Sequence, residues 1–235
     1  MRTRAGAAAR RPSPGARVNS MPTTAELTLL ASAWILYFLL HSLLASLRVK
    51  RFFARRLPPV MPWYRLLFNL IAAILLLPPL ALLWLYRSDP LWQWQGGMAW
   101  LAYALMLLAL LGFIWSMGYY DSKEFLGLGQ LQRGQGDGGD REQLRISPLH
   151  RFVRHPWYSL GLVLIWTQDM DPARLVSASI VTAYLVLGSR LEEAKLLRCH
   201  GDAYRDYRQR VPGLIPRPWR FLRPSEVERI LGKYR

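Results

Sequence analysis

Three long stretches without a charged side chain constrain the fold of this 235-residue chain more than any other feature. No Lys, Arg, Asp or Glu occurs in residues 27–47, 66–86 or 90–120. Because a helix needs about 20 apolar residues to cross the hydrocarbon core of a bilayer, each stretch is long enough to span a membrane. A helix also satisfies its own backbone hydrogen bonds inside lipid, so the stretches predict an all-α, polytopic membrane protein.

Two shorter apolar runs follow, residues 157–168 and 173–189, separated by the turn sequence Asp169-Met-Asp-Pro172. The first run is short for a membrane span. A helix extended back to Phe152 would be longer, with its charged residues at the membrane edge. We therefore expect about five transmembrane helices, of which the last two form a tight hairpin.

The basic residues alternate between the two ends of these segments. Residues 48–65 and 121–156 contain six Lys and Arg each, and the chain from residue 190 onward contains twelve, whereas residues 88–97 and 168–172 contain none. Under the positive-inside rule this pattern places the N-terminus outside and the C-terminus in the cytoplasm. The net charge of +16 then reflects topology and attraction to anionic lipid headgroups, and we predict no nucleic-acid partner.

The two ends of the chain differ from the membrane region in composition. Residues 1–23 form a basic, Ala-, Gly- and Pro-rich tail that we expect to be disordered. Met21 comes directly before the first membrane segment, so translation starting at Met21 is a hypothesis that intact mass would test. Beyond Glu193 the apolar residues recur at helical spacing, which predicts an amphipathic cytoplasmic helix ending before Pro212. A short terminal helix is expected after Pro224.

Cations, an imidazole, a phenol and two carboxylates lie next to the predicted hairpin. The sequence Arg154-His155-Pro156-Trp157-Tyr158 precedes its first helix, and Glu192-Glu193 follows its second. Because a hairpin returns the chain to the side that it left, the two groups should meet at one membrane depth. Ionisable groups at a membrane boundary are costly, so they indicate a functional site.

Cationic and anionic walls together suit a zwitterionic ligand with a sugar. Arg or His pairs with a carboxylate, and Glu accepts hydrogen bonds from an ammonium or from ribose hydroxyls. Aromatic faces suit a sulfonium or an adenine ring. S-adenosylmethionine has all of these parts. The alternative is a structural ion pair of Arg154 with Glu192 or Glu193 that closes the hairpin, and residue types alone favour neither reading.

Other reactive residues give weaker signals. The single cysteine, Cys199, excludes an internal disulfide, and the four histidines lack metal-ligand spacing, so we predict no metal. His41, near the end of the first membrane stretch, either hydrogen-bonds another helix or lines a substrate cavity. Tyr120, at the end of the third stretch, is the second candidate for such a cavity.

The order and spacing of these motifs resemble the isoprenylcysteine carboxyl methyltransferase and phospholipid methyltransferase superfamily. The resemblance covers residues 148–218 and rests on the Arg-His-Pro-x-Tyr run, the glutamate pair, Gly201-x-x-Tyr204-x-x-Tyr207 and Val211-Pro212-x-Leu-Ile-Pro216. Upstream, residues 41–46 and 125–128 resemble the bacterial branch that includes methanethiol S-methyltransferases and NnrU-like proteins.

The resemblance implies a bacterial inner-membrane enzyme that transfers a methyl group in line from S-adenosylmethionine. Its acceptor would be an apolar or small, membrane-permeant thiol, carboxylate or amine. Arg154 and His155 would be catalytic. The implied cofactor site comprises Arg154, His155, Pro156 and Tyr158 on one wall and Glu192 and Glu193 on the other, with Tyr204 and Tyr207 as a lid or positioning pair.

The expected organisation is a three-helix membrane region (24–120), a cytoplasmic linker (121–147), the cofactor region (148–218) and a basic tail (219–235). Three departures from the family pattern are notable: His150 replaces a family Tyr, Gly161 is shifted by one position, and Gly129 stands where relatives carry Arg. The first two are expected to affect the cofactor pocket and the third the acceptor. The alternative function is a non-catalytic membrane scaffold that keeps the fold, and no oligomeric state is predicted.

Overall fold

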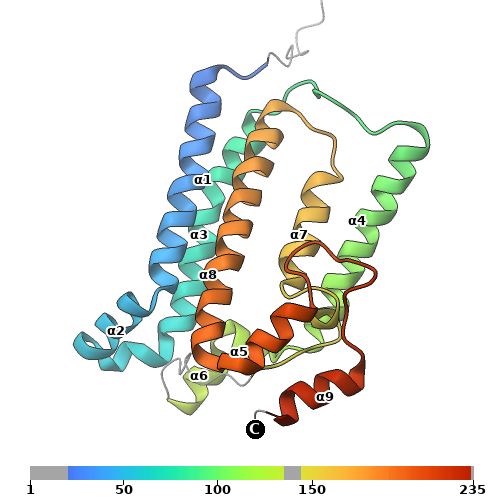
Figure 1. Cartoon of the computed structure of the whole chain (residues 1–235). Coiled ribbons are helices and arrows are strands. Elements are labelled where there is room, and N and C mark those ends of the chain that lie inside the picture. The colour runs from blue at the N-terminus through green and yellow to red at the C-terminus, as the bar shows by residue number, and fades with distance from the viewer. Residues whose placement is uncertain (1–20, 135–143, 234–235) are drawn as a thin grey trace, which may run out of the picture.

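A computed structural model describes residues 21–134 and 144–233, and within these ranges the regular structure is helical, without a β-strand. The chain is therefore an all-α protein, as predicted (Figure 1). The predicted disorder of residues 1–20 and the Gly-rich linker at residues 135–143 lie outside the described residues.

Four helices are long and apolar enough to cross a membrane among the described residues: α1 (Thr24–Ala45), α3 (Tyr64–Leu85, preceded by the 3-10 turn η1, Pro58–Trp63), α4 (Gly96–Met117) and α8 (Pro172–Arg210). Helix α1 begins with reciprocal hydrogen bonds between Thr23 and Glu26, in which the backbone N–H of Thr23 donates to Glu26 Oε2 over 2.7 Å. These helices confirm the membrane prediction made from the uncharged stretches.

The first helix of the predicted hairpin is shorter than a full span. Helix α7 covers Pro156–Trp166, or 11 residues, which corresponds to about 16 Å. The extension back to Phe152 does not occur, because a separate 3-10 turn, η2, occupies Leu149–Arg151 and Pro156 begins the helix. Proline suits a first helical position and disfavours helical backbone in the residue before it. Among the described residues, the bundle thus has four helices long enough to span and one half-length apolar helix, in line with the short first run of the predicted hairpin.

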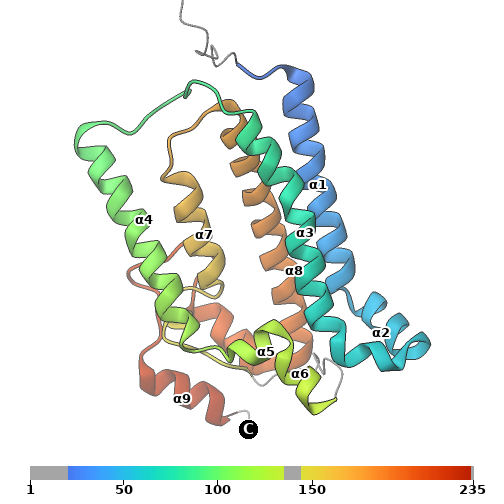
Figure 2. The same cartoon turned by 180° about the vertical axis from the view of Figure 1, so that it is seen from behind.

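The helices form two groups. Helix α1 packs against α3 and α8, and α4 packs mainly against α7 (Figures 1 and 2). Leu30, Trp34 and Ala173 are buried where α1 meets α8, and Trp34 Nε1 donates to Ser177 Oγ over 2.9 Å. This contact fixes the start of α8, whose middle carries both glutamates of the site.

Helix α8 continues past the membrane region instead of ending there. Gly201 interrupts its helical geometry at φ 51° and ψ −123°, and helix then resumes up to Arg210. A positive φ is costly for residues with a Cβ, so glycine at this position permits the kink. The predicted amphipathic cytoplasmic helix is therefore the last part of α8, and it ends before Pro212 as expected.

Short helices surround this end of the bundle. They are α2 (Leu47–Arg56), α5 (Ser122–Leu126), α6 (Leu128–Arg133) and the predicted terminal helix α9 (Pro224–Lys233) (Figure 1). Helix α9 packs onto the last part of α8, and a buried apolar cluster joins them: Tyr204, Tyr207, Val211, Leu222 and Ile230. The C-terminal segment is thus part of the folded structure around the predicted site.

Candidate functional site

Residues 211–222, which we call the strap, run back from the end of α8 along the segment before α7. The backbone N–H of Arg154 donates to Pro212 O over 2.8 Å, and that of His155 donates to Gly213 O over 3.1 Å. The strap therefore replaces the helical hydrogen bonds that this segment lacks, and it holds both side chains at the start of α7.

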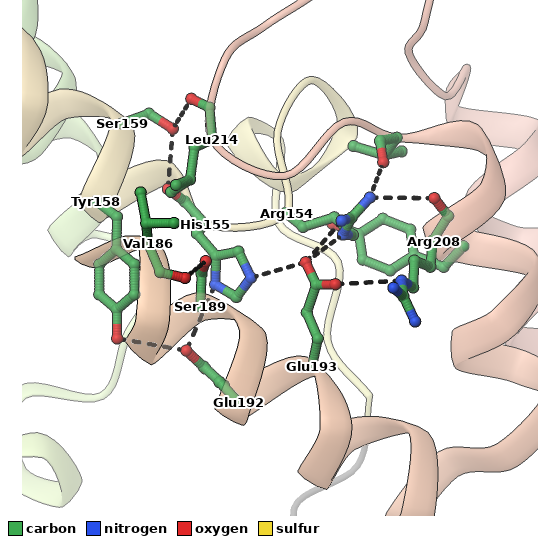
Figure 3. A network of polar contacts seen from close by, with 12 residues as sticks. Arg154, His155, Tyr158, Ser159, Val186, Ser189, Glu192, Glu193, Arg208 and Leu214 are labelled. Atoms are coloured by element: carbon green, nitrogen blue, oxygen red, sulfur yellow. Dashed lines mark hydrogen bonds and ion pairs between the residues drawn. The ribbon is translucent and has the colours of Figure 1, made fainter. Parts of the chain in front are cut away.

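Glu193 lies at the centre of the cationic residues. Its Oε1 accepts from Arg154 Nε at 2.8 Å and Nη2 at 2.6 Å, and it lies 3.2 Å from His155 Nε2 (Figure 3). Its Oε2 lies 3.2 Å from Arg208 Nε. The Glu193 side chain is only 8% exposed, so this carboxylate is a buried counter-ion shared by three side chains.

The guanidinium of Arg154 is also committed to protein partners. Its Nη1 donates to the backbone carbonyls of Arg208 and Val211, in addition to the two bonds to Glu193. Gly213 leaves room for it, because a Cβ at that position would lie 3.3 Å from Arg154 Nη2. The ion pair predicted as the structural alternative is thus present, and it joins α8, the strap and the segment before α7.

Glu192 differs from its neighbour in exposure. Its side chain is 48% exposed, and its Oε2 lies 3.4 Å from both His155 Nδ1 and the Tyr158 hydroxyl. The rings of His155 and Tyr158 stack at 5.4 Å with planes 12° apart. The structure therefore confirms the expectation that the Arg-His-Pro-x-Tyr segment lies against the glutamate pair.

The environment of His155 favours its charged form. Burial lowers the pKa of this imidazole, but the hydrogen bonds and charges of Glu192 and Glu193 raise it by more, so that it ends above its ordinary value. Nearby, burial and the positive charge of His155 lower the pKa of His150 to about 4 against a smaller opposing effect of Glu192. His150 is therefore neutral at physiological pH, and its Nδ1 lies 2.7 Å from Ser147 Oγ.

The two tyrosines on the last part of α8 have different roles. The Tyr207 hydroxyl donates to the carbonyl of His150 over 2.7 Å, which ties α8 to η2. Tyr204 is 1% exposed, and within the described residues its hydroxyl has no hydrogen-bond partner. A buried hydroxyl without a partner costs free energy, so a native structure rarely contains one without a reason such as a ligand or a water.

The two candidates for a substrate cavity lie in separate places. His41 Nδ1 lies 3.1 Å from the Tyr184 hydroxyl, so His41 joins α1 to α8, as the helix-contact alternative requires. Tyr120 packs against Trp157 with ring centroids 4.9 Å apart, next to the start of α7. Of the two, Tyr120 lies nearer to the charged site, because it contacts Trp157, which directly precedes Tyr158.

Sequence reasoning missed Arg208, the third cation on Glu193, and it also missed the strap. The signal for the strap was the Val-Pro-x-Leu-Ile-Pro motif, whose prolines stop α8 and turn the chain back. A Cβ on Gly161 would meet nothing within 4 Å, whereas a Cβ on Gly129 would clash with Glu124 Oε1 at 2.5 Å. The effects of these two departures on the cofactor pocket and on the acceptor stay predictions. Among the described residues no group of three or more His, Cys, Asp or Glu side chains is arranged so that it could hold a metal ion.

The fold and site define an integral membrane protein with a buried Arg–His–Glu network at one end of its bundle. Methanethiol S-methyltransferase 2 from Bradyrhizobium diazoefficiens is 33% identical to this chain over 188 residues, which cover 77% of the chain and 70% of the relative. Methanethiol S-methyltransferase from Mycobacterium tuberculosis is 32% identical over 185 residues, or 77% and 74% of the two chains.

Nurim from Xenopus laevis is a more distant match, 29% identical over 114 residues that cover 47% of this chain and 39% of Nurim. No family model and no solved structure matches. The chain belongs to the membrane methyltransferase family of the methanethiol S-methyltransferases, within the isoprenylcysteine carboxyl methyltransferase-like superfamily. The resemblance predicted from the motifs is confirmed.

Proposed function

We propose that the chain is an S-adenosylmethionine-dependent methyltransferase that acts on a small, membrane-permeant thiol. The observation that carries this proposal is the meeting of Arg154 and His155 with Glu192 and Glu193 in a chain of this family. The names of the relatives favour a thiol over a carboxylate or an amine as acceptor.

The residues present fit the cofactor, and the two glutamates would have different roles in binding it. Glu193 is buried and fully engaged, so its role is to hold Arg154 and His155 in place. Glu192 is half exposed, which leaves it able to accept hydrogen bonds from an ammonium or a ribose. The buried Tyr204 hydroxyl supplies a donor that no group among the described residues accepts from.

The cofactor would supply an already activated methyl group, which leaves the protein mainly the task of alignment. Holding two reactants in line supplies about 7–11 kcal/mol of the barrier reduction. A thiol acceptor must also lose its proton. Because the raised pKa of His155 favours its protonated form, Glu192 Oε2 is the better-placed proton acceptor.

The cofactor test compares wild type with Tyr204→Phe and Tyr207→Phe, purified in detergent and melted with and without S-adenosylmethionine. A ligand at 100 times its Kd stabilises by about 2.7 kcal/mol. We expect wild type and Tyr207→Phe to keep the shift and Tyr204→Phe to lose part of it at equal ligand concentration. Methyl transfer to methanethiol, followed as dimethyl sulfide, then tests the acceptor.

The second candidate is a non-catalytic scaffold that retains the fold. The observation in its favour is that Arg154 and Glu193 satisfy each other through contacts that need no ligand. Absence of any thermal shift at saturating S-adenosylmethionine, in a protein that melts cooperatively, would select this candidate. In either case we propose a bacterial inner-membrane location with the site on the cytoplasmic side, which the basic loops support.

A further inference from the structure

Helix α2 presents an arginine-rich face that has no role in the site described above. Arg48, Arg51, Arg55 and Arg56 line one surface hollow together with Phe52, and all five residues are exposed. Helical spacing explains the grouping, because residues three, four and seven positions apart lie on one face of a helix. The arginines are therefore gathered around a common space and not spread around the helix.

The orientation of this face is fixed by packing on the opposite side of α2. Phe53 is partly buried, and its ring lies 5.7 Å from the ring of Tyr64 at the start of α3. At the N-terminal end of α2, the side chain of Ser46 accepts from the backbone N–H of Val49 over 3.3 Å. A single residue, Ser46, thus separates α2 from the end of α1, and α2 is held there with its arginines outward.

Negative charge to balance these arginines is scarce in the protein. Residues 48–65 contain no Asp or Glu. In the part of the chain that the structure describes, no carboxylate forms an ion pair with Arg48, Arg55 or Arg56, and Arg51 Nε donates to the carbonyl of Leu47 over 3.2 Å. Four guanidinium groups around one hollow repel each other unless an anion neutralises them.

We propose that this face of α2 is a binding site for the phosphate of an anionic phospholipid headgroup. Guanidinium groups bind phosphate oxygens by paired hydrogen bonds. The position favours a lipid over a dissolved anion, because the hollow lies at the end of a membrane-spanning helix. Exposed Phe52 and Trp63 are the aromatic residues expected at the headgroup level. The site is independent of methyl transfer.

The test uses the full-length protein in detergent, and native mass spectrometry counts bound phosphatidylglycerol against phosphatidylcholine. The variant is Arg51→Gln with Arg55→Gln. The matched control is Arg198→Gln with Arg229→Gln, which removes the same charge from two exposed positions outside α2. We expect the α2 variant to lose about 30-fold in phosphatidylglycerol affinity and the control to lose little.

Three outcomes would overturn the proposal. The first is equal binding of phosphatidylglycerol and phosphatidylcholine by wild type. The second is an equal loss of affinity in the control variant, which would indicate attraction by overall charge. The third is competition by millimolar inorganic phosphate, which would indicate a small-anion site. Unchanged melting of both variants in the same detergent without added phosphatidylglycerol shows that a loss of affinity does not come from unfolding.

Discussion

Replacing Glu193 by Gln tests whether this carboxylate is the counter-ion that organises the site. The change keeps the shape of the side chain but removes its charge. Glu193 accepts two bonds from Arg154 and lies 3.2 Å from both His155 and Arg208. The variant would leave the Arg154 guanidinium, which is 12% exposed, without a compensating negative charge.

The expected cost follows from this burial. Removing one partner of a buried ion pair destabilises proteins by about 3–5 kcal/mol. For a chain of this size each kcal/mol lowers Tm by about 2–4 °C, so the variant should melt roughly 6–20 °C below wild type. Glu192→Gln is the matched control, because Glu192 is adjacent, half exposed and held by long contacts. Exposed pairs contribute at most about 1 kcal/mol, so its Tm should change by less than roughly 4 °C.

The assay is thermal unfolding in detergent, followed by intrinsic fluorescence, with S-adenosylmethionine binding measured on the same samples. The stability loss should appear in Glu193→Gln, whereas Glu192→Gln should fold normally and bind the cofactor weakly. Glu193→Ala should abolish binding, because it releases Arg154 and His155. A Glu193→Gln protein that melts like wild type, or a Glu192→Gln protein that is the less stable of the two, would refute this reasoning.

Three further predictions concern pH, backbone and topology. The pKa of His155 is raised in the folded protein. The stabilisation by its positive charge is therefore fully present below pH 6.5 and is lost as pH rises through the folded pKa. The Tm difference between wild type and His155→Gln should accordingly shrink at alkaline pH. Gly127→Ala should lower the free energy of unfolding in urea by more than about 1 kcal/mol, since φ at Gly127 is 92° and the new Cβ would lie 2.6 Å from Leu66 N. The control is Gly97→Ala, whose Cβ would meet nothing within 4 Å and which should not lower the free energy of unfolding. An impermeant maleimide should label the exposed Cys199 in inverted vesicles, and labelling of intact spheroplasts alone would reverse the proposed orientation.

The parts of the fold that depend on local sequence could be predicted. Apolar stretches without charge define the long helices, since lipid excludes charged side chains and unsatisfied backbone. The turn before Pro172 predicted that the chain returns, and this return brings Arg154 to Glu193. The end of α8 before Pro212 followed from proline chemistry.

The remaining features depend on contacts that local sequence does not encode. Helix α7 begins only at Pro156, and the backbone N–H groups of Arg154 and His155 bond to strap residues that lie more than 50 positions away in the chain. Nothing in the spacing of Arg208 showed that it would approach Glu193 after a kink at Gly201. The unequal exposure of Glu192 and Glu193 also could not be predicted from sequence. Adjacent residues on a helix point in different directions, and only the structure shows which of the two side chains points toward Arg154.

The strap has a consequence for how the protein is made. Leu222 of the strap donates its backbone N–H to the carbonyl of Arg151, and the Arg151 side chain donates to the carbonyl of Leu222, 71 positions along the chain. All the long helices are complete in the nascent chain before residue 211 has been synthesised. A ribosome that stops early would therefore release a product that inserts into the membrane with its helices intact but without an ordered Arg154. We therefore expect membrane insertion to be possible without the strap, and the ordering of Arg154 and His155 to require that residues 212 and 213 be translated.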